Sequence, residues 1–266
     1  MKQRTFLSLA TAGAVLALSA CSEGTGTSLT SEAELSEDVV AAAGDAIAAD
    51  VGAMVNNEVS VGAAMPGSAH PSNLTPPPGW TVVRTMVCFD ATPTAQAACD
   101  ALTTASIQFN VSIDGSFQRS RQSPRGTETM SIAVHRDRQL TVSGLAGTET
   151  FRVHNGFGAS ADTAEFSGTH NGVDHSRIAR ETSNDTVNAV RFNLPRGTNP
   201  WPVSGSIVRN VSGTVDITVG EREETRSYTR RVEVTFPADA QGNVAINING
   251  RSCTLNLVTH VVANCS

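Results

Sequence analysis

Apolar and polar residues alternate with a period of two over most of the chain beyond residue 80. Val, Ile, Leu, Met and Phe occupy every second position in several runs, at 130–134, 140–142, 215–219, 232–236 and 244–248. Such alternation puts apolar side chains on one face of a strand and polar side chains on the other, which is typical of antiparallel sheets. We therefore predict a mainly β domain over residues 81–266. The alternatives are a sandwich, a half-barrel or a barrel meander of roughly a dozen short strands.

Asn-Gly pairs interrupt this alternation at residues 155–156, 171–172 and 249–250. Both residues of a type I′ hairpin turn need a positive φ, which Asn and Gly adopt most readily. The pair at 249–250 is the strongest case, because alternating runs flank it on both sides. We expect tight hairpins at these positions.

A different period marks residues 31–56, for which we predict one N-terminal amphipathic α-helix. Ser31 and Glu34 have the spacing of a capping box. Apolar residues at three- and four-residue spacing form one stripe, made of Leu35, Val39, Ala43, Ile47, Val51 and Met54 or Val55. Gly44 and Gly52 each cost about 1 kcal/mol of helix propensity, so the helix needs a partner surface. We expect the stripe to cover one face of the sheet; the alternative is a lid or a helix that binds a partner.

Two segments without periodicity flank this helix. Residues 21–30 are small and polar and indicate a flexible tether. Residues 57–80 contain the triplet Pro76-Pro77-Pro78, and proline runs stiffen a chain into an extended spacer. The helix is therefore expected to dock on the sheet across a proline-rich linker.

The N-terminus has the pattern of a secretion signal. Lys2 and Arg4 precede 14 uncharged residues, 5–18. That stretch is too short to span a bilayer, which needs ~20 apolar residues, and it fits the apolar region of a signal peptide over residues 1–20.

Leu18-Ser19-Ala20-Cys21 follows directly and resembles a bacterial lipobox. The resemblance covers residues 1–22 and implies a bacterial lipoprotein that is cleaved before Cys21 and lipidated on the Cys21 thiol. It implies attachment to the membrane through that lipid. Ser22 stands where an Asp would favour retention in the inner membrane, so the resemblance points to the outer membrane of the cell envelope.

Four further cysteines lie in the remainder of the chain, Cys88, Cys99, Cys253 and Cys265. An even number in an exported protein predicts two disulfides. Their placement favours the local pairs 88–99 and 253–265, each worth roughly 3 kcal/mol. A four-cysteine zinc site is the alternative, but the spacings C-x10-C and C-x11-C lack the close C-x2-C pairs of structural zinc sites.

Charge restricts the choice of partners. From Cys21 onward the chain has 17 Arg, no Lys and 25 acidic residues, a net charge of −8. Eight of the acids and none of the bases lie between Cys21 and Val83. An acidic N-terminal segment disfavours nucleic acid and anionic lipid head groups as partners.

Sequence motifs nominate no catalytic residue, metal ligand or cofactor. The patterns G-x-S-x-G, H-E-x-x-H and G-x-x-x-x-G-K-[ST] are absent. The densest histidine cluster is His170 and His175 with Asp174 between them. Together with His154 it would hold a metal if a hairpin gathered these residues, but an exposed polar loop is the simpler interpretation.

Two classes of function remain open at this level. We expect a lipid-anchored envelope protein that is a non-enzymatic binding, carrier or structural module. Its partner would be a small apolar ligand or another envelope protein. A curved sheet closed by one helix looks loosely like the half-barrels of lipid and lipoprotein carriers, an analogy of fold alone. The alternative is a periplasmic or surface hydrolase whose site forms only in the folded chain.

The lipobox makes a direct prediction. Cys21→Ser removes the thiol that would carry the lipid, so the precursor should escape lipoprotein processing and leave the membrane fraction. Fractionation of cells followed by immunoblotting measures this. An unchanged membrane fraction would exclude the anchor.

Overall fold

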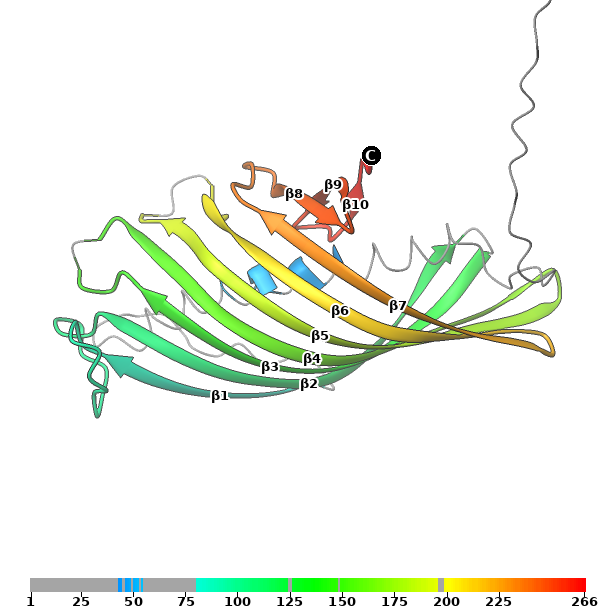
Figure 1. Ribbon diagram of the computed structural model, residues 1–266, viewed down its shortest axis with the longest axis horizontal. Helices are drawn as coiled ribbons and strands as arrows, with labels where there is room; N and C mark the ends of the chain where they lie inside the picture. Colours follow the sequence, from blue (N-terminus) through cyan, green and yellow to red (C-terminus); the bar gives the residue numbers. More distant parts are fainter. Residues whose placement is uncertain are drawn as a thin grey trace, which may run out of the picture.

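A computed structural model of the chain describes residues 43, 44, 46–48, 50–52, 54, 80–123, 126–147, 149–195 and 199–266. These residues form ten strands and a short helical segment (Figure 1). The strands are β1 (Trp80–Phe89), β2 (Ser106–Ser123), β3 (Gly126–Ser143), β4 (Phe151–His170), β5 (Val173–Asn193), β6 (Ser204–Val219), β7 (Arg222–Thr235), β8 (Asn243–Ile248), β9 (Arg251–Asn256) and β10 (Val262–Ala263).

All ten strands belong to one antiparallel sheet in which each strand pairs with its neighbours in sequence. The sheet curves strongly and does not close, so it has the shape of an open trough (Figure 1). The predicted mainly β, antiparallel fold with one helix is confirmed for the described residues. Of the alternatives that the alternation left open, the meander forms and the sandwich does not.

The strands are longer than the short strands that the alternation predicted. Each of β2 to β7 runs for 14 to 21 residues. One predicted turn is wrong: Asn155 and Gly156 lie inside β4, where the pairing register shifts between His154 and Gly156. The Asn155 side-chain oxygen accepts a hydrogen bond of 2.8 Å from the N–H of Ala189, beside a second shift in β5. This Asn-Gly pair therefore serves a β-bulge, which bends the sheet.

The other two Asn-Gly pairs do form hairpin turns. Asn171 and Gly172 join β4 to β5 with φ of 52° and 76°, and Asn249 and Gly250 join β8 to β9 with φ of 51° and 88°. These values are those of the type I′ turns that the sequence predicted.

The helical residues lie on the concave face of the sheet, where they complete the main hydrophobic core (Figure 1). The predicted stripe residues Ala43, Ile47, Val51 and Met54 are all buried there. Their partners on the sheet come from β3 and β5 to β9 and include Leu140, Val187, Phe192, Ile207, Val232, Val234, Val244, Ile246 and Leu255. Because β8 and β9 contribute to the same core, the C-terminal end of the sheet wraps toward the helix.

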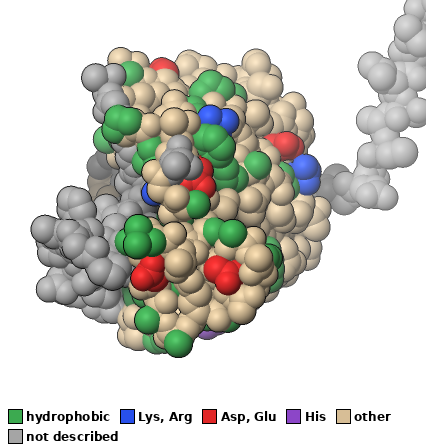
Figure 2. Space-filling model, turned by 90° about the vertical axis from the view of Figure 1, so that its left-hand side faces the viewer, with side chains coloured by type: hydrophobic (Ala, Val, Ile, Leu, Met, Phe, Trp, Pro, Cys, Tyr) green, Lys and Arg blue, Asp and Glu red, His purple; other side chains and the backbone are tan. Residues whose placement is uncertain are grey.

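A smaller core closes one end of the trough, where β1 ends and β2 begins. Cys88, Ile107, Phe109, Val142 and Leu145 are buried together. Figure 2 faces this end and shows hydrophobic side chains in small separate patches on a surface with few charged groups.

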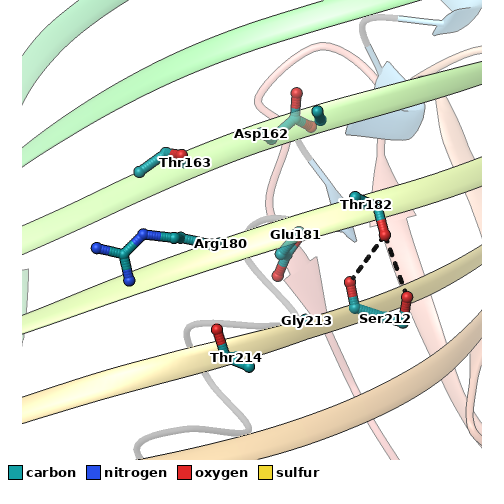
Figure 3. Close-up of a pocket in the computed structure, with 9 residues that line it drawn as sticks. Asp162, Thr163, Arg180, Glu181, Thr182, Ser212, Gly213 and Thr214 are labelled. Carbon is teal, nitrogen blue, oxygen red and sulfur yellow. Dashed lines mark hydrogen bonds between the residues drawn. The ribbon is translucent and has the colours of Figure 1, made fainter.

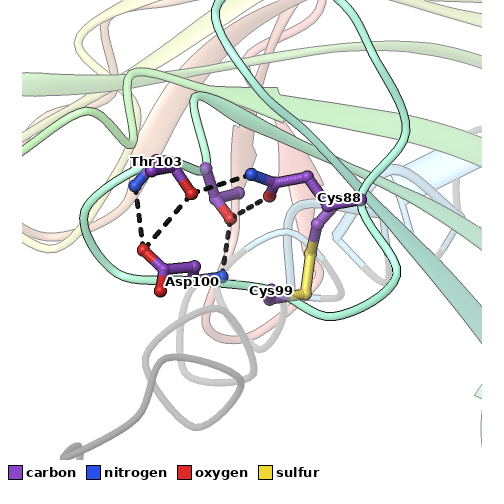
Figure 4. The surroundings of a disulfide bond; sticks show 6 residues. Cys88, Cys99, Asp100 and Thr103 are labelled. Carbon is purple, nitrogen blue, oxygen red and sulfur yellow. Dashed lines mark hydrogen bonds between the residues drawn. A yellow bond between two sulfur atoms is a disulfide. The ribbon is translucent and has the colours of Figure 1, made fainter.

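Both predicted disulfide pairs are within bonding distance, with Cα–Cα separations of 5.3 Å for Cys88–Cys99 and 4.1 Å for Cys253–Cys265. The first closes the loop between β1 and β2 (Figure 4). In that loop the Asp100 carboxylate accepts bonds from the backbone N–H and the hydroxyl of Thr103. The loop is therefore a fixed cap on this end of the sheet.

Several predicted features lie outside the described residues. They are the signal peptide, Cys21, the tether, most of the predicted helix, and the linker up to residue 79. No helix among the described residues is long and apolar enough to cross a membrane.

Two glycines of the helical segment provide a matched test of its docking. A Cβ on Gly44 would lie 2.8 Å from Cγ2 of Val262, whereas a Cβ on Gly52 would meet nothing within 4 Å. We predict that Gly52→Ala raises the free energy of unfolding by about 1 kcal/mol, through helix propensity. Gly44→Ala should lower it by about 1–3 kcal/mol, through overpacking.

Urea denaturation of the two variants measures these effects. Equal stabilisation by both substitutions would mean that the helix does not rest on the C-terminal strands.

Candidate functional site

The concave face carries charged side chains in its middle, directly beside the apolar core. Eight residues from the helix and from β3 to β6 form what we call the trough cluster: Asp50, Arg136, Arg138, Ser160, Asp162, Ser183, Asp185 and Arg209. Three arginines balance three aspartates, so the cluster is neutral overall. Strand register explains its formation. Arg138 of β3 lies opposite Gly158 of β4, and Gly158 lies opposite Asp185 of β5. Asp185 in turn lies opposite Arg209 of β6.

The cluster joins the helix to the sheet. Nη2 of Arg138 lies 2.5 Å from Oδ1 of Asp50 and 3.1 Å from Oδ2 of Asp185. Both carboxylate side chains are only 1% exposed. Arg138 therefore bridges one carboxylate of the helix and one of β5, in an environment where an unpaired charge costs several kcal/mol.

Arg209 occupies the centre of the cluster. Its Nη2 donates to the Ser160 hydroxyl at 2.7 Å and to Oδ2 of Asp162 at 3.2 Å, and its Nη1 lies 3.6 Å from Asp185. The Ser160 and Ser183 hydroxyls bond to each other at 2.8 Å. Arg136 contacts Asp162 from the other side, at 3.2 Å. All eight residues therefore belong to one connected network.

The network shifts the pKa values of two of its members. Burial raises the pKa of Asp185 above its ordinary value; Arg209 opposes this rise and the neighbouring Asp50 adds to it. Burial by itself would lower the pKa of Arg136, but Asp162 and Asp50 outweigh it and raise that pKa. Because the folded-state pKa of Asp185 is raised, its ionisation costs stability as the pH rises through that value.

Four buried atoms of the network have no hydrogen-bond partner among the described residues. They are the acceptors Oδ2 of Asp50 and Oδ1 of Asp162, and the donors Nε of Arg136 and Nη1 of Arg209. Unpaired buried polar groups are rare in proteins and cost about 1–3 kcal/mol each. As far as the described residues go, the cluster therefore offers two acceptors and two donors that a further polar group could meet.

A second polar group flanks the trough cluster on β5 and β7. The Tyr228 hydroxyl donates to the Glu181 carboxylate at 2.6 Å, and the Arg230 guanidinium lies 4.0 Å from the Tyr228 ring centroid. Burial and the Glu181 charge raise the pKa of Tyr228 well above its ordinary value. Tyr228 therefore stays neutral and acts as a hydrogen-bond donor.

A third group lies farther along β3 and β5, near the hairpin that joins β4 to β5. Arg177 donates to both oxygens of Glu128, at 3.0 and 2.8 Å, and Nε2 of His175 lies 3.0 Å from the same carboxylate. All three side chains are almost fully buried. Charged groups thus line much of the concave face beyond the apolar core.

The convex face differs, because small hydroxyl side chains dominate it. A shallow hollow there involves three short runs of β4, β5 and β6 (Figure 3). Its lining residues are Ala161, Asp162, Thr163, Arg180, Glu181, Thr182, Ser212, Gly213 and Thr214. The Thr182 hydroxyl bonds to Ser212, and Arg180 pairs with Asp216. These exposed groups satisfy one another, so the hollow is a weaker candidate than the trough cluster.

The histidine cluster that the sequence offered as an alternative metal site does not assemble. His154 lies at one end of β4, buried with its ring edge against Phe192, while His170 ends the same strand 16 residues later. His175 pairs with Glu128. Among the described residues no group of three or more His, Cys, Asp or Glu side chains is placed to hold a metal ion.

The sequence contains one signal for the trough cluster, which the alternation pattern alone does not resolve. Val134, Arg136, Arg138 and Leu140 share one face of β3, so two arginines occupy positions in register with buried apolar residues. A single strand does not show whether such arginines are buried. Their partners Asp50, Asp162 and Asp185 are distant in sequence, and only the folded chain brings them together.

Comparison with known proteins gives no relatives: no family model matches the chain, and no curated protein or solved structure matches it either.

Arg209 provides a test of the network. Arg209→Met leaves Asp162 and Asp185 without their shared partner, so we predict a loss of about 3–5 kcal/mol of unfolding free energy. The control is Arg180→Met, which removes an exposed ion pair with Asp216 and should cost less than about 1 kcal/mol. Chemical denaturation measures the unfolding free energy of both variants. Similar losses would show that the buried network stabilises the fold no more than an exposed ion pair does.

Proposed function

We propose that this protein is a lipid-anchored, non-enzymatic binding or carrier module of the bacterial cell envelope. Its ligand would be a small amphipathic molecule with an apolar body and a polar head. One observation carries the proposal: an open trough places an apolar core beside a buried charge cluster in which several polar atoms find no hydrogen-bond partner among the described residues. Ligand sites typically combine such an apolar lining with a few placed polar groups.

The cover of the trough supports this proposal. A single curved sheet buries one face only, and this chain covers that face with a short helical segment instead of a second sheet. The helix contributes small residues, Ala43, Ala46 and Ala48, as well as Ile47 and Val51. If the helix moved away, the apolar side chains of β5 to β9 that it covers would become accessible.

The ion pair between Asp50 and Arg138 links the helix to the proposed polar end of the ligand site. A buried ion pair contributes little net stability compared with apolar packing, but it fixes where a helix sits. Here it attaches the cover to the network whose polar atoms would meet the head of the ligand. Exchange of the Asp50 carboxylate for a ligand head group would release the helix without leaving Arg138 unpaired.

The hydrolase alternative finds less support in the same residues. The carboxylates of Asp162 and Asp185 both contact Arg209, which holds them as ion-pair partners. The hydroxyls of Ser160 and Ser183 bond to each other and to the charged groups around them, not to a histidine. This arrangement lacks the nucleophile and base pairing that acyl transfer requires.

Binding of cis-parinaric acid, a fluorescent fatty acid, tests the proposal on lipid-free chain 22–266. We predict saturable binding to the parent chain. The double variant Gly44→Cys with Val262→Cys should lock the helix onto β10, since these two positions are in contact. Locking should weaken binding at least tenfold.

Each single cysteine variant is the matched control, and mass spectrometry identifies the crosslinked pair. No saturable binding, or equal binding by the locked and unlocked proteins, would refute the trough as the ligand site.

A further inference from the structure

The helical segment occupies the trough in the way that an amphipathic ligand would. Its residues Ala43, Ile47, Val51 and Met54 pack into the main apolar core on the concave face. Asp50 is the only charged residue among the described helical residues, and its side chain is 1% exposed. The described part of the helix therefore presents the sheet with an apolar body and a single negative charge.

A boundary between apolar and charged side chains crosses the sheet beneath the helix. On β3, β5 and β6, a residue of the main core lies two positions from a charged residue of the trough cluster, on the same face of the strand. These pairs are Leu140 and Arg138, Val187 and Asp185, and Ile207 and Arg209. Asp50 contacts the charged side of this boundary at Arg138, while Ile47, one turn away on the helix, lies on the apolar side. The charge of the helix therefore sits where the apolar contact ends.

Without Asp50 the sheet side of the cluster has an excess of positive charge. Its three arginines come from β3 and β6, but β4 and β5 contribute only two aspartates. Arg138 would be left with Asp185, which it shares with Arg209. The neighbouring Glu181 does not supply the missing charge, because it pairs with Arg230 and Tyr228. The sheet therefore requires one further anion, and an uncompensated buried charge is costly.

Asp50 supplies this charge but leaves donors of the sheet unused. Only Oδ1 of Asp50 contacts Arg138, and its Oδ2 has no hydrogen-bond partner within the described residues. The same holds for two donors on the sheet, Nε of Arg136 and Nη1 of Arg209. The docked helix fixes the position of the Asp50 carboxylate, whereas the anion of a free ligand can adjust its position to such donors. Asp50 is therefore an anion that a ligand can replace with a gain in hydrogen bonding.

We infer that Asp50 is a built-in substitute for the head group of the ligand, and that the trough selects amphiphiles whose head carries a single negative charge. This inference rests on the proposed function, because it names the class of ligand for the same site. The apolar chain of such a ligand replaces the buried side chains of the helix, and its anion replaces the Asp50 carboxylate on Arg138. The helix and the ligand therefore compete for the trough.

Other head groups fit the charge balance less well. A neutral head group would displace Asp50 without replacing its charge, and would leave the excess arginine uncompensated in a buried site. A cationic head group would add a positive charge to a sheet that already has one in excess. A carboxylate and a phosphodiester both carry the single negative charge that the sheet requires, so fatty acids and acidic phospholipids share the chemistry of this site.

Isothermal titration calorimetry with ligands of one chain length tests this selectivity on lipid-free chain 22–266. The probes are decanoate, decanoyl-lysophosphatidylglycerol, decanol and decyltrimethylammonium, each below its critical micelle concentration. We predict that the two anions bind at least tenfold more tightly than the neutral and the cationic probe. The order of the two anions then shows whether a carboxylate or a phosphodiester is preferred, and either order agrees with the inference.

The possible failures of this experiment are distinguishable. Binding of decanol or decyltrimethylammonium as tightly as decanoate would overturn the inference and leave the trough as a ligand site. Binding of none of the four probes would overturn the proposed function and this inference with it.

Asp50→Asn separates competition by charge from simple attachment of the helix. A loosened helix makes the trough available to every ligand by the same factor. Loss of the Asp50 charge also leaves Arg138 in need of an anion, so the affinity for decanoate should rise at least tenfold more than the affinity for decanol. Asp216→Asn is the control, since Asp216 is exposed and pairs with Arg180 on the convex face. It should change neither affinity.

Equal gains for decanoate and decanol in the Asp50→Asn variant would overturn the role of Asp50 as a substitute for the head group. Circular dichroism shows whether this variant folds. If it does not, the comparison of the four probes on the parent chain still decides, because it requires no substitution.

Discussion

Burial of a single face governs this structure. Ten antiparallel strands in one open sheet create a concave surface that is apolar at one end. Among the described residues, the helical segment and the curled strands β8 and β9 cover it. Apolar burial is worth roughly 25 cal/mol per Å². The described helical residues between 43 and 54 therefore stabilise the fold strongly for so short a segment. The need to bury this face explains why β8 and β9 curl toward the helix. It also explains why the trough cluster lies beside the helix.

The trough cluster carries a desolvation cost within this arrangement. Three arginines and three aspartates are withdrawn from water, and their attraction only offsets the loss of hydration when every group is well paired. Four of its buried polar atoms have no hydrogen-bond partner within the part of the chain that the structure describes. Well-packed apolar residues at these positions would avoid this cost, and for this reason the network is the part of the concave face on which the proposed ligand site rests.

The sequence predicted the fold to the extent that its signals are local. Alternation over 81–266 identified the antiparallel sheet, and the stripe through Ile47 and Val51 identified the buried face of the helix. Strand lengths were underestimated because Gly115, Gly156 and Gly213 resemble turn residues, although each continues a strand. At Gly156 a side chain would collide with the backbone of β3, and at Gly213 it would collide with Tyr228 and the backbone of β5. The candidate site was missed because Asp50, Arg138 and Asp185 come together only through long-range contacts.

The meander topology has a consequence for the order of assembly. Because every strand pairs with its neighbour in sequence, the sheet can grow hairpin by hairpin with short loop closures, and low contact order favours rapid folding. The helix precedes the sheet in the chain but contacts β3 and the strands from β5 to β9, so its site is complete only after most of the chain has emerged. The helix, which is synthesised before the sheet, is thus the last of these elements to find its place, and until then the trough remains open.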